Sequence, residues 1–173
     1  MRVGYRLRQF WRRLGARDAA GAQEVAQRVL PPAAYALFCT LDVGDQLHAW
    51  DVWKFLHCRG RPSPDLAQAA LLHDVGKAGA GLTLVHRALI VLLRKVYPAA
   101  LEWLARDEPG SWRYPFYVQL RHAELGAMAC ARAGCSATTV ALVRHHEHKA
   151  PEAWGDVPWH EDLLALQEAD EAC

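Results

Sequence analysis

Long apolar runs are missing from this 173-residue sequence. The most apolar segment, Ala88 to Leu93, is far shorter than the roughly 20 residues that a transmembrane helix needs. The N-terminus is basic, but it lacks the continuous hydrophobic stretch of a secretory signal peptide. These absences lead us to expect a soluble protein of the cytoplasm.

The sequence has no excess of charge of one sign, and it has no cysteine pattern typical of a disulfide-bonded protein. The 20 Lys and Arg residues nearly balance the 19 Asp and Glu residues, so the net charge of +1 gives no clear reason to expect a nucleic-acid partner. The five cysteines are odd in number and form no Cys-x-x-Cys pair. We therefore expect reduced thiols rather than a set of disulfide bonds.

The chain length and the apolar fraction of 52% suit one compact domain. Residues 2–17 place apolar side chains at helical spacing and arginines on the other face, which predicts a basic amphipathic helix. We assign residues 1–30 to this helix and a connector, and residues 31–173 to the main domain. We interpret the helix as docked on the core; the alternative is a weak contact of its arginine face with an anionic surface.

No segment shows the alternating pattern of a β-strand, whereas helical periodicity recurs along the chain. The helices that we expect span residues 45–56, 65–75, 84–97, 98–106, 115–133, 136–148 and 160–172. Ser63 and Pro64 are residue types typical of an N-cap and a first helical turn. The strongly apolar helix over 84–97 is expected to be buried. The sequence thus predicts an all-α bundle with a site between its helices.

An adjacent His-Asp pair ends the expected 65–75 helix. Leu66, Ala70 and His73 follow one helical face, so His73 continues the buried stripe. Asp74 lies about 100° around the helix from His73. Two neighbouring ligands can therefore reach one metal region.

Two other helices each offer a ligand at an apolar edge. Asp170 continues the face formed by Leu163 and Leu166, where a carboxylate without a partner would be costly. A metal would remove that cost. His48 lies one turn before Val52 on the 45–56 helix.

The remaining histidine candidates lie in the expected 115–133 and 136–148 helices. His146 comes four residues after Leu142 and so shares its face, which favours His146 over its neighbour His145 as the inward ligand. His145 stays an alternative. His122 is followed one turn later by Gly126, which would let another element approach closely.

Taken in order, these residues carry a resemblance to a known family. The set consists of His48, Leu72-His73-Asp74-Val75-Gly76-Lys77, His122, His145-His146-Glu147 and Ala169-Asp170. It resembles the HD superfamily of metal-dependent phosphohydrolases over roughly residues 45–171. The resemblance implies an HD-domain helical bundle with the metal site between helices.

The resemblance also implies ligands and a reaction. The basic metal set would be His48, His73, Asp74 and Asp170. His122 and His146 would serve a second ion, with Asp74 bridging the two. Nitrogen and carboxylate donors without thiolate suit one or two divalent ions of Mn, Fe, Co, Ni or Mg. A metal-activated hydroxide would hydrolyse a small phosphorylated substrate such as a nucleotide.

Two further residues receive catalytic roles beside Asp74. Lys77 matches the lysine of the extended motif and would add positive charge at the phosphate. Glu147 follows the His pair and would orient a ligand or accept a proton.

Two departures from the family pattern narrow the prediction. No Gly-Tyr-Pro follows His145-His146-Glu147, which argues against a cyclic dinucleotide as the substrate. Gly44 stands where a Glu would be expected for a third ion, so at most two ions are predicted. The alternatives are a non-catalytic HD module that binds a nucleotide or a protein, and an HD-fold di-iron oxygenase. The sequence is silent on the oligomeric state.

Overall fold

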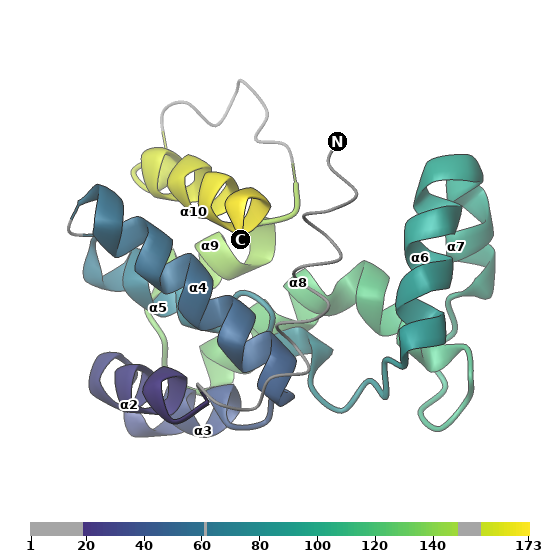
Figure 1. Ribbon diagram of the computed structural model, residues 1–173, viewed down its shortest axis with the longest axis horizontal. Coiled ribbons are helices and arrows are strands. Elements are labelled where there is room, and N and C mark those ends of the chain that lie inside the picture. The colour runs from purple at the N-terminus through teal and green to yellow at the C-terminus, as the bar shows by residue number, and fades with distance from the viewer. Residues whose placement is uncertain (1–18, 61, 149–156) are drawn as a thin grey trace.

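A computed structural model describes residues 19–60, 62–148 and 157–173. These residues form α-helices and one short 3-10 helix, and no strand (Figure 1). In chain order the elements are α2 (Ala19–Val29), α3 (Pro32–Phe38), α4 (Val43–Arg59), α5 (Pro64–Leu72), η1 (Val75–Lys77), α6 (Leu84–Val96), α7 (Pro98–Leu104), α8 (Tyr114–Arg132), α9 (Ala137–His145) and α10 (His160–Ala172). The expected all-α class is confirmed for these ranges. The helix that we expected over residues 2–17 lies outside the described residues. None of the described helices has both the length and the apolar character to cross a membrane.

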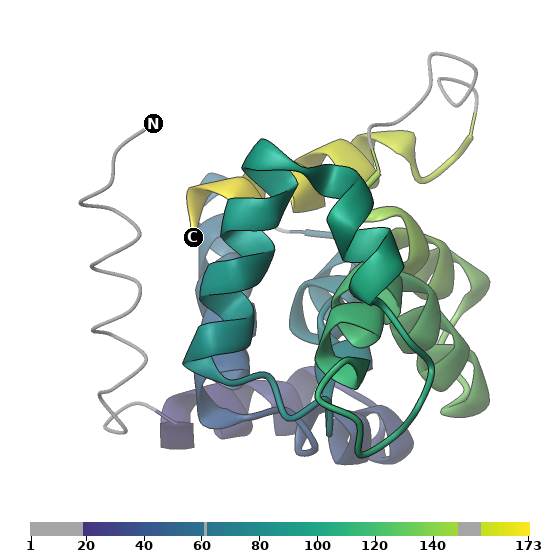
Figure 2. The same cartoon turned by 90° about the vertical axis from the view of Figure 1, so that its right-hand side faces the viewer.

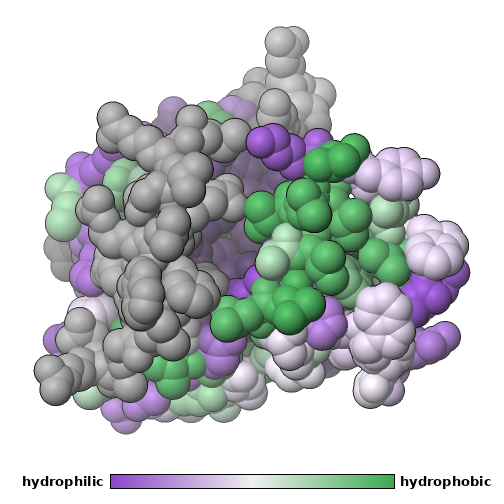
Figure 3. All heavy atoms as spheres, turned by 45° about the vertical axis from the view of Figure 1, so that its right-hand side comes forward, coloured by the Kyte–Doolittle hydropathy of each residue, from purple (hydrophilic) through white to green (hydrophobic). Residues whose placement is uncertain are grey.

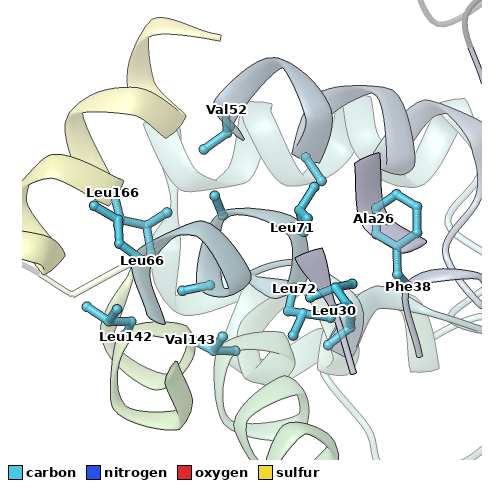
Figure 4. Packing of buried hydrophobic residues seen from close by; sticks show 14 of the residues in the cluster. Ala26, Leu30, Phe38, Val52, Leu66, Leu71, Leu72, Leu142, Val143 and Leu166 are labelled. Atoms are coloured by element: carbon cyan, nitrogen blue, oxygen red, sulfur yellow. The ribbon is translucent and has the colours of Figure 1, made fainter. Parts of the chain in front are cut away.

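Helix α5 is the centre of the main hydrophobic core. Ser63 caps its first turn by accepting a hydrogen bond from the Leu66 amide at 3.1 Å, as the sequence predicted. Its Ala and Leu side chains are buried on nearly every face, because α2, α3, α4, α9 and α10 all pack around it. Figure 4 shows Leu71 and Leu72 between Val52 of α4 and Val143 of α9.

The expected 65–75 helix ends earlier than its periodicity suggested. Leu72 is the last residue of α5, His73 caps it, and the chain turns at Asp74 with φ −100° and ψ 3° before η1 begins. The neighbouring helices α2 and α3 were not predicted at all. Leu30 and Pro31 separate these two helices, and the apolar faces of both helices join the main core.

Helices α6 and α7 form a hairpin at one end of the molecule (Figures 1 and 2). The hairpin has its own small core around Ile90, Leu101 and Phe116. The expectation that the 84–97 helix is buried was wrong, because only Ile90 of α6 is buried while Val85 and Leu92 are 67% and 55% exposed. One face of α6 packs within the hairpin, and its Arg87 and Arg94 form ion pairs with Asp45 and Glu147 outside it.

Candidate metal centre

Side chains from separate helices meet around Asp74 in the interior of the bundle. One group of possible metal donors is His48, His73 and Asp74, and a second is Asp74, His122 and His146. Within each group the donor atoms lie within 4.8 Å of one another. Asp74 belongs to both groups, which is the arrangement that a bridging carboxylate requires.

A close backbone contact fixes Asp74 relative to α8. Gly76 of η1 lies directly against α8, where a Cβ atom on Gly76 would be 2.0 Å from the His122 carbonyl oxygen and 2.7 Å from the Gly126 amide nitrogen. Only glycine permits this approach. The sequence predicted that Gly126 would admit a neighbouring element, and that element is η1.

Each buried histidine of the two groups is oriented by its own backbone. The ring Nδ1 atoms of these histidines lie at hydrogen-bond distance from the carbonyl oxygen three residues earlier. The pairs are His73 with Ala70 at 3.0 Å, His122 with Gln119 at 3.0 Å and His146 with Val143 at 2.8 Å. Because a carbonyl only accepts, Nδ1 carries the proton in each neutral ring, and Nε2 keeps a free lone pair. The Nε2 atoms are the ring nitrogens that face the cluster.

The Nε2 atoms lack the partners that buried polar atoms normally have. His73 Nε2 is buried and has no hydrogen-bond partner. His122 Nε2 lies 3.3 Å from His146 Nε2, so two lone pairs face each other at a distance where a hydrogen bond would need a proton. A cation between these nitrogens and Asp74 would satisfy them all. The residues present therefore fit a divalent metal ion.

His48 and Asp170 lie at the edge of the first group. His48 Nε2 is 2.8 Å from Asp170 Oδ1, which is in turn 3.6 Å from His73 Nε2. Burial opposes the charge on Asp170, but the hydrogen bond from His48 and the neighbouring His73 lower the pKa of this carboxyl below its usual value. Asp170 is thus an ionised oxygen donor beside the group, with its side chain 31% exposed.

Lys77 compensates the charge of Asp74. Its Nζ lies 2.7 Å from each carboxylate oxygen of Asp74. Although burial opposes ionisation, Lys77 and the surrounding histidines hold the pKa of Asp74 well below its usual value. Burial likewise opposes the charge on Lys77, but Asp74 outweighs it and raises the pKa of the lysine. Both side chains are therefore charged, and the carboxylate can serve a metal without losing a proton.

The histidines of the second group are held neutral. Burial, with the nearby charge of Lys77, lowers the pKa of His122 to about 4. Burial, with His73 alongside, lowers the pKa of His146 to about 4. A metal ion does not have to displace a proton from either ring near neutral pH, which favours binding.

The structure separates the two histidines that the sequence left open. His146 is buried in the second group, whereas the ring of His145 stacks on Trp159 with the centroids 5.5 Å apart and the planes at 4°. Glu147 lies at the edge of the cluster. Its Oε1 is 3.8 Å from His122 Nε2 and 3.5 Å from an Arg94 nitrogen.

Sequence reasoning missed Asp45, which comes one turn before His48 on α4. Asp45 is only 3% exposed, and its charge helps to raise the pKa of Lys77. The Arg87 guanidinium lies 3.3 Å from it. The available signal was an acid three residues before a candidate ligand, on the same helical face.

Comparison of the chain with models of protein families, with curated proteins and with solved structures returned no match. The established features are therefore those of the molecule itself: an all-helical fold in the described ranges and buried His and Asp groups suited to a metal ion.

Proposed function

We propose that this chain is a divalent-metal-dependent phosphohydrolase of the HD superfamily, acting on a nucleotide or another small phosphoester. The observation that carries the proposal is the pair of donor groups that share Asp74, with unpartnered imidazole nitrogens facing the carboxylate. The ordered sequence motif around His73 and Asp74 supports the same family. The side-chain geometry and the sequence motif concern the same residues, but the first is a spatial arrangement and the second is a pattern along the chain.

The donor chemistry favours a site for one or two ions of Mn, Fe, Co, Ni or Mg. The groups offer imidazole nitrogen and carboxylate oxygen, and they contain none of the five cysteines. His48, His73 and Asp74 would hold one ion with help from Asp170, and Asp74, His122 and His146 the other. Bound divalent metal supplies Lewis acidity and lowers the pKa of coordinated water to the physiological range.

The protein's own charges prepare the site for a phosphate. Lys77 is charged and its side chain is 16% exposed beside Asp74, so its Nζ would offer a positive point charge to a phosphoryl oxygen. Asp74 holds that ammonium in place. Glu147 lies at the edge of the site, with Oε1 3.8 Å from His122 Nε2, where it would accept a proton from a water molecule in the site.

Space for a leaving group adjoins Glu147. A depression of about 500 Å³ lies between α8 and α9, within the size range of small-molecule sites. Its lining includes Arg121, Arg144 and His148. Because Arg144 is paired with Glu124 of the same lining, at 2.8 and 3.1 Å, Arg121 and His148 are the groups that would contact an anionic leaving group.

The test combines metal analysis with turnover. We expect the purified protein to bind divalent metal and to release phosphate or nucleotide from a panel of nucleotides, cyclic dinucleotides and phosphomonoesters with Mn, Mg, Co or Ni. Both properties should be lost in Asp74→Ala, because this change removes the carboxylate common to both groups. An Asp74→Ala protein that remains fully active would exclude the proposal.

Adjacent histidines provide a matched control. His146→Gln should lose metal and activity, whereas His145→Gln should keep its metal, because only His146 belongs to a donor group. Nucleotide-induced stabilisation without turnover would instead indicate a non-catalytic binding module. Bound iron with a mixed-valence spectrum and no phosphatase activity would indicate an oxygenase.

A further inference from the structure

Two arginines of α6 face the edge of the metal centre. Arg87 lies 3.3 Å from Asp45 of α4, and Arg94 lies 3.5 Å from Glu147 at the edge of the cluster. The two arginines are seven residues apart, so they share one face of the helix. Figure 3 shows hydrophobic residues over the hairpin and, beside them, a hollow with hydrophilic residues. The ion pairs therefore turn the cationic face of α6 toward the cluster.

The two guanidinium groups differ in how fully their N–H donors are used. Arg87 contacts two carboxylates, with one nitrogen 3.2 Å from Asp42 and 3.3 Å from Asp45, and its side chain is 26% exposed. Arg94 makes a single ion pair within the described ranges, and its side chain is 45% exposed. A guanidinium has five N–H donors in a planar fork that fits the oxygens of a phosphate. Arg87 thus anchors α6 to α4, whereas Arg94 keeps donors for a ligand.

Glu147 connects Arg94 with the metal centre. Its Oε1 is 3.8 Å from His122 Nε2 and 3.5 Å from the Arg94 nitrogen, so one carboxylate separates the guanidinium from a possible metal donor. Glu147 also lines the depression between α8 and α9. The cluster, Arg94 and the depression therefore all adjoin the same glutamate.

This arrangement assigns Arg94 to a part of the substrate beyond the reacting phosphate. A phosphate bound at the donor groups would occupy the space next to the Nε2 atoms. Arg94 lies one contact farther out, past Glu147, and would meet the next group along the substrate. Its charge and its planar fork suit a second phosphate.

On the basis of the hydrolase function above, we propose that Arg94 is a specificity-determining residue that binds a second phosphate next to the scissile one. Nucleoside diphosphates and triphosphates are then preferred over monophosphates. Arg87 has no such role, because its donors are directed at Asp42 and Asp45.

Calorimetric titration with two probes that the protein cannot hydrolyse tests this preference. Inorganic phosphate represents one phosphate group, and methylenediphosphonate represents two. With equal free metal in every titration, we expect the metal-loaded protein to bind methylenediphosphonate at least about tenfold more tightly than phosphate, because Arg94 adds charged hydrogen bonds. Arg94→Gln should remove most of this advantage, and it should leave the affinity for phosphate within about threefold. Arg94→Lys should restore only part of the advantage, because lysine keeps the charge and lacks the planar fork.

Lys95→Gln is the matched control, because it removes the neighbouring positive charge of α6. Lys95 is exposed and makes no ion pair within the described ranges. Both probes should therefore bind this variant as they bind the unchanged protein. An equal loss of the advantage in Lys95→Gln and Arg94→Gln would overturn the proposal, because the effect would then come from the general charge of the helix.

Two further results would overturn the preference and leave the hydrolase function intact. The first is equal affinity of the unchanged, metal-loaded protein for the two probes. The second is an advantage of methylenediphosphonate that survives in Arg94→Gln. Metal content and turnover are measured separately, so a protein that binds neither metal nor phosphate would overturn the hydrolase function and this preference together.

Discussion

At the scale of single residues, the imidazole nitrogens of the cluster are in a costly arrangement. A buried polar atom without a hydrogen bond costs about 1–3 kcal/mol, and His73 Nε2 is such an atom. The facing Nε2 atoms of His122 and His146 add to this cost, because neither neutral ring has a proton to place between them. Strain of this kind is expected at a functional site, where a ligand relieves it.

The metal-free protein should lose stability as the pH falls from about 6.5 to 4. His122 and His146 have their pKa values lowered from 6.5 to about 4 in the fold, so in this window the unfolded chain binds protons that the folded chain does not. Protonation therefore favours unfolding. We expect a loss of roughly 3 kcal/mol or more across this range, measured by urea unfolding at a series of pH values.

Replacement of both rings provides the control for this pH dependence. His122→Asn with His146→Asn removes the two titrating groups, and its stability should change much less between pH 6.5 and 4. An equally steep loss in this variant would assign the acid sensitivity to other groups.

The sequence indicated which side chains gather in the cluster where helical spacing decided the matter. His146 shares the face of Leu142, and the structure buries it in the cluster while His145 stacks on Trp159. The burial of Asp45 was not foreseen, because its environment comes from α6, which lies far along the chain. Spacing reports the face of one helix and contains no information on what a distant helix brings to it.

At the scale of elements, the contact between η1 and α8 determines the geometry of the cluster. Gly76→Ala should destabilise the protein by about 3 kcal/mol or more, because the new methyl group would overlap backbone atoms that cannot move aside. The same displacement would separate Asp74 from His122. Urea unfolding and metal-binding titration should therefore both show large losses.

A graded series of glycine substitutions checks this explanation. At Gly126 the nearest atom to a new Cβ is 3.2 Å away, and at Gly60 nothing lies within 4 Å. The loss of stability should thus decrease from Gly76→Ala through Gly126→Ala to Gly60→Ala. A Gly76→Ala protein as stable as Gly60→Ala would contradict the close approach of η1 and α8.

The positions of helix ends and the burial of whole helices were the features that the sequence predicted least well. Periodicity carried the expected helix through to Val75, but tight packing of η1 on α8 ends α5 at Leu72. The apolar composition of α6 suggested burial, whereas the hairpin covers only one of its faces. Periodicity describes a helix by itself, and both errors arose from packing between helices.

At the scale of the whole molecule, the cluster joins helices that are distant in sequence. The donor side chains come from α4, the α5–η1 turn, α8, the end of α9 and α10. Apolar contacts hold the same helices around α5. A metal ion bound to these side chains would exist only when the helices are assembled, so its binding free energy would add to the stability of the fold.

Metal ions should therefore raise the melting temperature of protein that has been stripped with a chelator. At a free metal concentration of about 100 times Kd the gain is about 2.7 kcal/mol. For a domain of this size that corresponds to a rise of roughly 5–10 °C, measurable by calorimetry.

Asp74→Asn should lose most of this rise, because the shared carboxylate is gone while the volume of the side chain is kept. His145→Gln should keep it, because His145 belongs to neither donor group. If Mn, Fe, Co, Ni and Mg all left the melting temperature unchanged, the cluster would not be a metal site. The unpartnered nitrogens would then be a cost that the surrounding core alone offsets.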